Sequence, residues 1–158
     1  MHPSVEHVTR TLADLGATKA SGSIRVLPEA ARTATAAADQ LGIGMAQIAN
    51  SLIFAADGAP VLVMASGGHR VDTAKVATIL GAGRVDRATP EFVREHTGFA
   101  IGGVAPVGHP APIRTLVDVE LQQYDEVWAA AGHPNTVFPT TYDELLAITG
   151  GEPAEIGQ

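Results

Sequence analysis

The chain contains no cysteine among its 158 residues, which excludes disulfide bonds, thiol nucleophiles and cysteine-based zinc or iron–sulfur sites. Aromatic residues make up only 4% of the sequence, so the core must consist mainly of valine, isoleucine, leucine and alanine. No apolar run approaches the ~20 residues of a membrane span, and the N-terminus lacks the basic and apolar regions of a signal peptide. These absences favour a reducing compartment, and we expect a cytoplasmic protein without a membrane partner.

Positive charge is missing from the last part of the chain. All ten Lys and Arg residues lie at or before Arg114, together with nine acidic residues, whereas eight acidic residues and no Lys or Arg follow. The formal net charge of −7 disfavours broad, sequence-independent binding to nucleic acid. A polyanionic partner would have to approach the first two-thirds of the chain. The candidate contacts there are Lys19, Arg25, Arg70 and Lys75. For each of them taken singly, scattered solubilising charge is the favoured interpretation.

The chain length predicts one domain, residues 1–158, with a core of its own. Caps and apolar periodicity predict helices over Ser4–Leu15, Thr33–Leu41, from Asp72 or Thr73 to Leu80, from Thr89 to Gly98, and from Thr141 to Gly150. Strands are expected over Ile24–Leu27, Ile48–Ala55, Pro60–Ala65, near Val85, over Leu116–Val119 and over Val127–Ala131. Asp57-Gly58 predicts a hairpin turn. This mixture predicts an α+β fold, with a mixed, mostly antiparallel sheet and flanking helices.

The segment Gly98–His109, called here the glycine loop, contains four glycines and a proline among apolar residues. Glycine costs about 1 kcal/mol and proline about 3 kcal/mol inside a helix, so the segment is not an ordinary helix. Glycine lets the backbone turn sharply and approach a ligand closely, and exposed N–H groups bind carbonyl, oxyanion or phosphate oxygens. The alternative is a tight structural turn, but the length of the segment favours a binding loop.

Three further places carry polar groups of interest. Asn50 shares a strand face with large apolar residues, where it either bonds to nearby backbone or forms the polar floor of a pocket. Ser66–Asp72 leads from a strand into a helix, where N–H groups suit an anion, unless Asp72 is only a cap and repels one. His133 follows a strand and is a candidate general base or hydrogen-bond donor.

Motifs for other chemistries are absent. The sequence contains no Walker, Rossmann or Gly-x-Ser-x-Gly motif, which disfavours nucleotide hydrolysis, dinucleotide binding and a serine triad. A metal hydrolase using His69, His109 and His133 remains an alternative, although these residues lack the spacing of paired metal ligands. We expect neither a metal ion nor a cofactor.

Four segments of the chain form a pattern in a fixed order: Gln47–Phe54, Val71–Ala77, Thr97–Gly108 and Ala131–His133. Together they resemble the YbaK/EbsC family, which is related to the editing insertion of bacterial prolyl-tRNA synthetases. The resemblance implies a compact α/β domain whose curved, barrel-like sheet surrounds a small pocket. It also implies a trans-editing deacylase that hydrolyses the ester of a mischarged aminoacyl-tRNA at its 3′ end, with an aminoacyl-tRNA synthetase as a further partner.

The resemblance also implies roles for individual residues. Amides of the glycine loop, from Gly102 and Gly103, would hold the ester carbonyl while water attacks, helped by a hydroxyl of the terminal adenosine. Asn50 would orient the substrate and His133 would assist. The residues expected to contact the substrate are Ser66, Gly67, His69, Arg70, Ile101, Val104, Pro106 and Gly108.

One residue departs from the family pattern. Members with established activity usually carry lysine where Asn50 stands, and lysine supplies a full positive charge where asparagine supplies a dipole. Loss of a charged hydrogen bond costs about 1.5–3 kcal/mol. Three alternatives follow: His133 or Arg70 compensates, the substrate differs, or the chain is a catalytically weakened binding module for aminoacyl-adenosine-like ligands.

Overall fold

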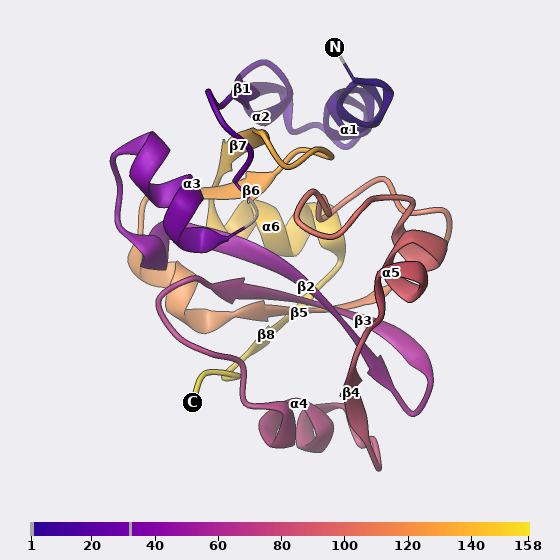
Figure 1. Cartoon of the computed structure of the whole chain (residues 1–158). Helices are drawn as coiled ribbons and strands as arrows, with labels where there is room; N and C mark the ends of the chain where they lie inside the picture. Colours follow the sequence, from indigo (N-terminus) through magenta and orange to yellow (C-terminus); the bar gives the residue numbers. More distant parts are fainter. Residues whose placement is uncertain (1, 32) are drawn as a thin grey trace.

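The computed structural model describes residues 2–31 and 33–158 (Figure 1). The described residues form one sheet of eight strands, surrounded by helices and two short 3₁₀ segments. The helices are α1 (Pro3–Asp14), α2 (Thr18–Ser21), α3 (Ala34–Leu41), α4 (Thr73–Leu80), α5 (Pro90–Thr97) and α6 (Tyr142–Thr149), and the 3₁₀ segments are η1 (Met45–Gln47) and η2 (Val119–Gln123). The strands are β1 (Arg25–Val26), β2 (Ile48–Ala56), β3 (Ala59–Ser66), β4 (Val85–Arg87), β5 (Arg114–Asp118), β6 (Val127–Ala130), β7 (Thr136–Thr140) and β8 (Glu152–Ala154).

The sheet is mixed, as the sequence predicts. Its order is β1-β7-β6-β2-β3-β5-β8, and β4 pairs with β2 in addition. Four of the pairings are antiparallel, namely β1 with β7, β6 with β7, and β2 with both β3 and β4. The pairings of β2 with β6, β3 with β5 and β5 with β8 are parallel. The expected α+β fold with a mostly antiparallel sheet is therefore confirmed.

The hairpin of β2 and β3 forms the centre of the sheet. Its two-residue turn has positive φ at both positions, 49° at Asp57 and 83° at Gly58, which is the type I′ geometry that matches the twist of paired strands. The Asp57 carboxylate also accepts hydrogen bonds from the N–H groups of Gly83 and Arg84. The turn therefore holds the start of β4 against the same hairpin.

The edge of β2 that faces away from β3 is only partly paired. β6 pairs with Ile48 and Ala49 at one end, and β4 pairs with residues 54–56 at the other. Between them, residues 50–53 have no strand partner on this edge in the described part of the chain. We call this gap the open edge of β2.

The helix starts follow local capping rules, with one correction. Thr33, Asp72, Thr89 and Thr141 cap α3, α4, α5 and α6 as predicted. The N-cap of α1 is His2 and not Ser4, because the His2 ring accepts a hydrogen bond from the Ser4 N–H at 3.1 Å. Pro3 then occupies the first turn, where its missing N–H costs no helical hydrogen bond.

The strands β7 and β8 and the short helix α2 are absent from the sequence prediction. β7 contains Pro139, which donates no ladder hydrogen bond and argues against a central strand. The N–H of Ala131 donates to the Thr136 carbonyl, so by alternation the Pro139 nitrogen faces β1. β1 pairs only with Thr136 and Val137, and the proline therefore removes no ladder bond.

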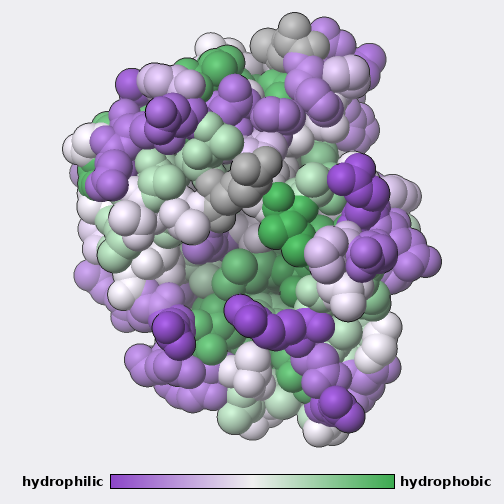
Figure 2. Space-filling model, viewed as in Figure 1, coloured by the Kyte–Doolittle hydropathy of each residue, from purple (hydrophilic) through white to green (hydrophobic). Residues whose placement is uncertain are grey.

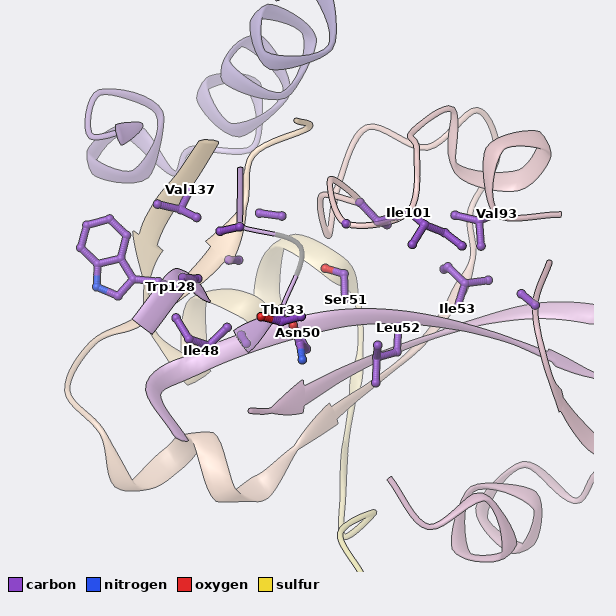
Figure 3. A pocket seen from close by; sticks show the side chains of 18 of the residues that line it. Thr33, Ile48, Asn50, Ser51, Leu52, Ile53, Val93, Ile101, Trp128 and Val137 are labelled. Atoms are coloured by element: carbon purple, nitrogen blue, oxygen red, sulfur yellow. The ribbon is translucent and has the colours of Figure 1, made fainter. Parts of the chain in front are cut away.

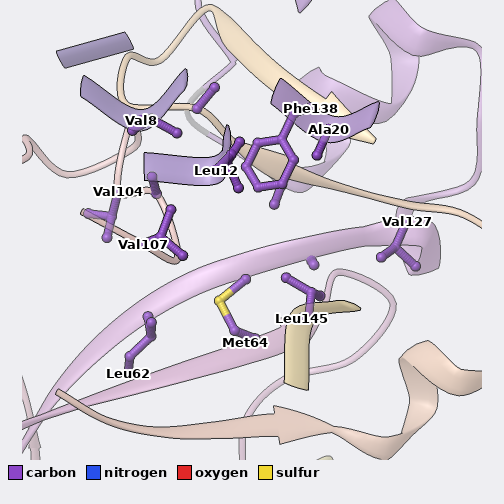
Figure 4. Close-up of a cluster of buried hydrophobic side chains, with 14 of the residues drawn as sticks. Val8, Leu12, Ala20, Leu62, Met64, Val104, Val107, Val127, Phe138 and Leu145 are labelled. Atoms are coloured by element: carbon purple, nitrogen blue, oxygen red, sulfur yellow. The ribbon is translucent and has the colours of Figure 1, made fainter. Parts of the chain in front are cut away.

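The largest buried cluster joins the sheet, α1, α6 and the glycine loop. Figure 4 shows Val8 and Leu12 of α1 above Val104 and Val107 of the glycine loop, and Leu62 and Met64 of β3 below them. All six side chains are buried, and apolar contacts of this kind stabilise a fold by about 25 cal/mol per Å² buried. The glycine loop is therefore packed between α1 and the sheet.

A buried carboxylate binds the main chain at the C-terminal end of β3. Asp118 is fully buried and accepts hydrogen bonds from the N–H groups of Ser66 and Glu120 at 2.9 and 3.0 Å. The Nε2 of His69 lies 2.5 Å from the same carboxylate. These partners offset the cost of burying the charge.

No helix in the described part of the chain is both long and apolar enough to cross a membrane.

Candidate functional site

A cavity of about 420 Å³ lies at the open edge of β2. Every residue from Ile48 to Phe54 lines it, and because successive strand residues point to opposite faces, the cavity must wrap around the edge of the strand. In Figure 2, hydrophobic residues gather in a hollow in the middle of the visible face, with hydrophilic residues around it. The gap in strand pairing is therefore the floor of a pocket.

The walls of the cavity are mostly apolar and come from distant parts of the chain (Figure 3). At one end Val93 of α5 and Ile101 of the glycine loop lie over Ile53 of β2. At the other end lie Trp128 of β6 and Val137 of β7. Ile101 is 49% exposed, which places an apolar side chain in contact with solvent at the mouth. Such a lining suits a ligand with an apolar part and few polar anchors.

Few polar side chains reach this cavity. They belong to Thr33, Asn50, Ser51 and Arg87, and Arg87 is the only charged residue among the described residues that line it. The Asn50 amide is half-buried and forms no hydrogen bond with any described residue, so its donors and acceptor are available to a ligand. The hydroxyl of Ser51 donates to the Met64 sulfur at 3.4 Å. No described side chain in the cavity is arranged as an activated nucleophile.

The glycine loop begins with a tight turn that determines which of its amides are available. The N–H of Gly103 donates to the Ala100 carbonyl at 3.0 Å, and Gly102, with φ of 90°, occupies the third position of this turn, as type II geometry requires. The Gly103 N–H was expected to bind the ester oxygen. That expectation is corrected, because this N–H already donates to Ala100 within the turn. Gly102 and Val104 line the cavity, and their N–H groups have no partner among the described residues.

Gly103 has a different role, which is close packing against the turn between β6 and β7. A Cβ atom at Gly103 would lie 3.0 Å from the Cα and the carbonyl carbon of His133. The two residues therefore lie together, but through their backbones. The His133 ring lies outside the cavity, with Nδ1 2.6 Å from the Asn135 side-chain oxygen and the His2 ring 4.8 Å away.

Two histidines hold the far end of the glycine loop. His7 of α1 lies with Nε2 2.8 Å from the Gly108 carbonyl oxygen, and His109 lies with Nε2 2.8 Å from that of Ala105. Burial lowers the pKa of His109; its bond to Ala105 opposes this shift, and the charge of His7 adds to it. The neutral ring, which donates to Ala105, is therefore the favoured form in the folded protein.

The structure places the residues expected at the site in different locations. Asn50, Ile101, Gly102 and Val104 line the cavity, whereas Pro106 and Gly108 of the glycine loop do not. Ser66, Gly67, His69 and Arg70 lie at the far end of β3, outside the cavity. There, Asp72 caps α4 by accepting from the N–H groups of Ala74 and Lys75, and this carboxylate occupies the position that an anion would need.

The three histidines of the metal-site alternative do not meet. Each has its own partner, Asp118 for His69, Ala105 for His109 and Asn135 for His133. Across residues 2–31 and 33–158, no group of three or more His, Asp or Glu residues is placed to hold a metal ion.

Arg87 also lines the cavity, and no pattern in the sequence indicates this, because the residue lies three positions before Pro90 outside any recognisable motif. Its place beside the cavity depends on the pairing of β4 with β2, where Arg87 is opposite Phe54. A hairpin signal alone does not reveal this pairing, because 26 residues (59–84), which include β3 and α4, lie between the central turn and the start of β4.

Comparisons with known proteins agree with this geometry. The family model described as "Aminoacyl-tRNA editing domain" matches residues 28–148. The Bacillus subtilis protein YwhH is 33% identical over 114 residues, covering 72% of each chain. EbsC of Enterococcus faecalis, a proposed Cys-tRNA(Pro)/Cys-tRNA(Cys) deacylase, is 27% identical over 125 residues, covering 78% of this chain and 76% of EbsC.

A solved structure has the same fold over the whole chain. It is a proposed trans-editing enzyme for prolyl tRNA synthetase, with a TM-score of 0.92, 40% identity and coverage of 100% of this chain and 99% of the other. The proline–tRNA ligase of Nitratidesulfovibrio vulgaris is 32% identical over 124 residues, and this match spans only 21% of the ligase. The resemblance to the YbaK/EbsC family is thereby confirmed.

The contact between Gly103 and His133 yields a test of how the glycine loop is held. We expect Gly103→Ala to lower the free energy of unfolding by about 1–3 kcal/mol, because the new methyl group overpacks backbone that cannot rotate away. Urea denaturation measures the change. Gly44→Ala is the matched control, since Gly44 has open space around it and a φ of −77°, and it should be as stable as the parent or slightly more so. Equal stability of both variants would contradict this account.

Proposed function

The chain belongs to the aminoacyl-tRNA editing domain family, and from this premise we propose that it is a deacylase acting in trans on mischarged tRNA. It would hydrolyse the ester that joins the amino acid to the 3′ end of the tRNA. The observation that carries this proposal is the cavity at the open edge of β2, which is lined on one side by Gly102 and Val104 of the glycine loop.

The reaction needs little beyond an oriented ester and water. The N–H groups of Gly102 and Val104 are the donors that would hold the ester carbonyl oxygen as negative charge develops on it, and one such donor contributes about 2.7–4 kcal/mol in other enzymes. Water then attacks the carbonyl carbon, and the bond to the ribose oxygen breaks. The ribose oxygen takes up a proton, and the products are the amino acid and the uncharged tRNA. The lack of an activated side-chain nucleophile is consistent with this route.

Asn50 and Arg87 are the side chains proposed to position the substrate. Asn50 stands where related deacylases usually carry lysine, and its unbonded amide lies in the cavity. Arg87 forms no ion pair with any described residue, so its charge is available to a phosphate near the 3′ end. We propose that Arg87, rather than His133 or Arg70, compensates for the missing lysine.

Asn50 also supports a second function, a binding module that holds aminoacyl-adenosine-like ligands without turnover. A neutral amide stabilises developing negative charge less than an ammonium group does. The cavity and its apolar lining would be the same in both cases, so turnover has to be measured to distinguish the two.

Hydrolysis of mischarged tRNA is the direct test. We expect the protein to deacylate at least one member of a panel of mischarged tRNAs well above the buffer rate, because the cavity supplies donors for the ester carbonyl. Release of labelled amino acid measures this, and heat-unfolded protein is the control. Tight binding with no release for every member of the panel would favour the binding module instead.

Substitutions at Asn50 test its orienting role. We expect Asn50→Ala to lower kcat/KM about 10-fold, since one neutral hydrogen bond to the substrate contributes about 1.5 kcal/mol or less, and Asn50→Lys to retain or raise activity. Single-turnover deacylation measures both variants. Full activity of Asn50→Ala would remove this residue from the mechanism, and activity in Asn50→Lys that the parent lacks would favour the binding module.

Arg87 has a matched control in Arg84, the residue directly before β4. Arg84 is ion-paired with Asp86 at 2.8 Å and does not line the cavity. We expect Arg87→Ala to raise KM for aminoacyl-tRNA several-fold and to make the salt dependence of binding shallower by about one charge, and Arg84→Ala to change neither. Binding measured from 50 to 200 mM salt provides the comparison. Identical salt slopes for the parent and Arg87→Ala would exclude a phosphate contact.

A further inference from the structure

The open edge of β2 exposes main-chain groups as well as side chains. The Gly67 N–H donates to the Ile48 carbonyl, and in an antiparallel pair alternate residues point their N–H and C=O groups to the same side. Ile48, Asn50 and Leu52 therefore point these groups toward β3, and Ser51 points its N–H and C=O away from β3. Neither group of Ser51 has a hydrogen-bond partner among the described residues.

β6 contributes a second carbonyl to the same place. The Ala131 N–H donates to the Thr136 carbonyl of β7, so by the same alternation Ala130 points its C=O toward β2. The pairing of β6 with β2 ends at Ala49 and Ala129, one residue before Ala130 could accept from the Ser51 N–H. Ser51 and Ala130 both line the cavity. Two carbonyl groups thus lie at the open edge without a donor from the described residues.

The charge of the residues around the cavity indicates which ligand groups these carbonyls can bind. A carbonyl in an apolar environment needs a hydrogen-bond donor, and leaving it unsatisfied is unfavourable. No Asp or Glu is among the described residues that line the cavity, so a cationic ligand group would find its acceptors in the main chain. The opening lies beside Gly102 and Val104, which are proposed to hold the ester carbonyl.

We propose that the carbonyl oxygens of Ser51 and Ala130 bind the protonated α-amino group of the aminoacyl ester. This inference rests on the proposed function for the identity of the ligand. A free α-amino group has a pKa of about 7.7–8.0, so it is mostly an ammonium at neutral pH and offers three donors. An N-acylated amino acid has neither the charge nor the second donor. The site therefore selects aminoacyl groups with a free amine and rejects N-blocked ones.

Two non-hydrolysable ligands test this selection without requiring turnover. The first is 3′-deoxy-3′-(L-alanylamino)adenosine, in which an amide replaces the ester, and the second is its N-acetyl derivative. Both are titrated into isotope-labelled protein and followed by NMR. We expect the free amine to bind at least 10-fold more tightly than the N-acetyl compound. We also expect it to shift the carbonyl ¹³C resonances of Ser51 and Ala130 more than that of Leu52, whose carbonyl points toward β3.

Each outcome has a separate meaning. Equal affinity for the two compounds, no binding of either, or unchanged Ser51 and Ala130 carbonyl resonances in the bound state would overturn the inference. Selective binding of the free amine, combined with no hydrolysis across the tRNA panel, would support the carbonyl pair and reject the deacylase proposal. Hydrolysis of aminoacyl-tRNA and of its N-acetyl derivative at the same enhancement over the uncatalysed rate would support the deacylase and reject the carbonyl pair.

Discussion

The site depends on how one strand shares its edge between two partners. β2 pairs with β6 at one end and with β4 at the other, and the two partners do not meet. A continuous partner along this edge would satisfy the Ser51 main chain and fill the space that the cavity now occupies. The gap between β6 and β4 along β2 therefore leaves both the volume and the unpaired polar groups, and the apolar walls from α5, the glycine loop and β7 enclose them.

The glycine loop lies over this opening because three contacts hold it there. Val8 and Leu12 of α1 pack on it, His7 reaches the Gly108 carbonyl, and the Gly103 backbone packs on that of His133. α1 lies before residues 28–148, the part that the family model matches. Amides held by packing in this way need no reorganisation when charge develops on a substrate, which is how main-chain donors act in catalysis.

Local signals in the sequence were sufficient for most elements. The Asp57-Gly58 turn, the caps at Thr33, Asp72 and Thr89, and the irregular glycine loop each depend on a few adjacent residues, and all appear in the structure. Features that depend on partners distant in sequence were not predictable. The segment that contains Ser66 and His69 suggested an anion site. In the structure, both residues instead bond to Asp118, which lies about fifty residues later in the chain. The open edge of β2 is likewise a property of strand register, which no single segment encodes.

The distribution of charge explains how a neutral residue at position 50 is compatible with a charged substrate. An aminoacyl-adenosine end carries an ammonium on the amino acid and negative charge on its phosphate, so a site can hold both with a cation near the phosphate and neutral acceptors at the ammonium. Arg87 is opposite Phe54, three residues or roughly 10 Å along β2 from Ser51. Asn50 adds no charge of its own beside the Ser51 carbonyl. With asparagine there, the positive charge stays at the β4 end, and the carbonyl pair remains available to the amino group.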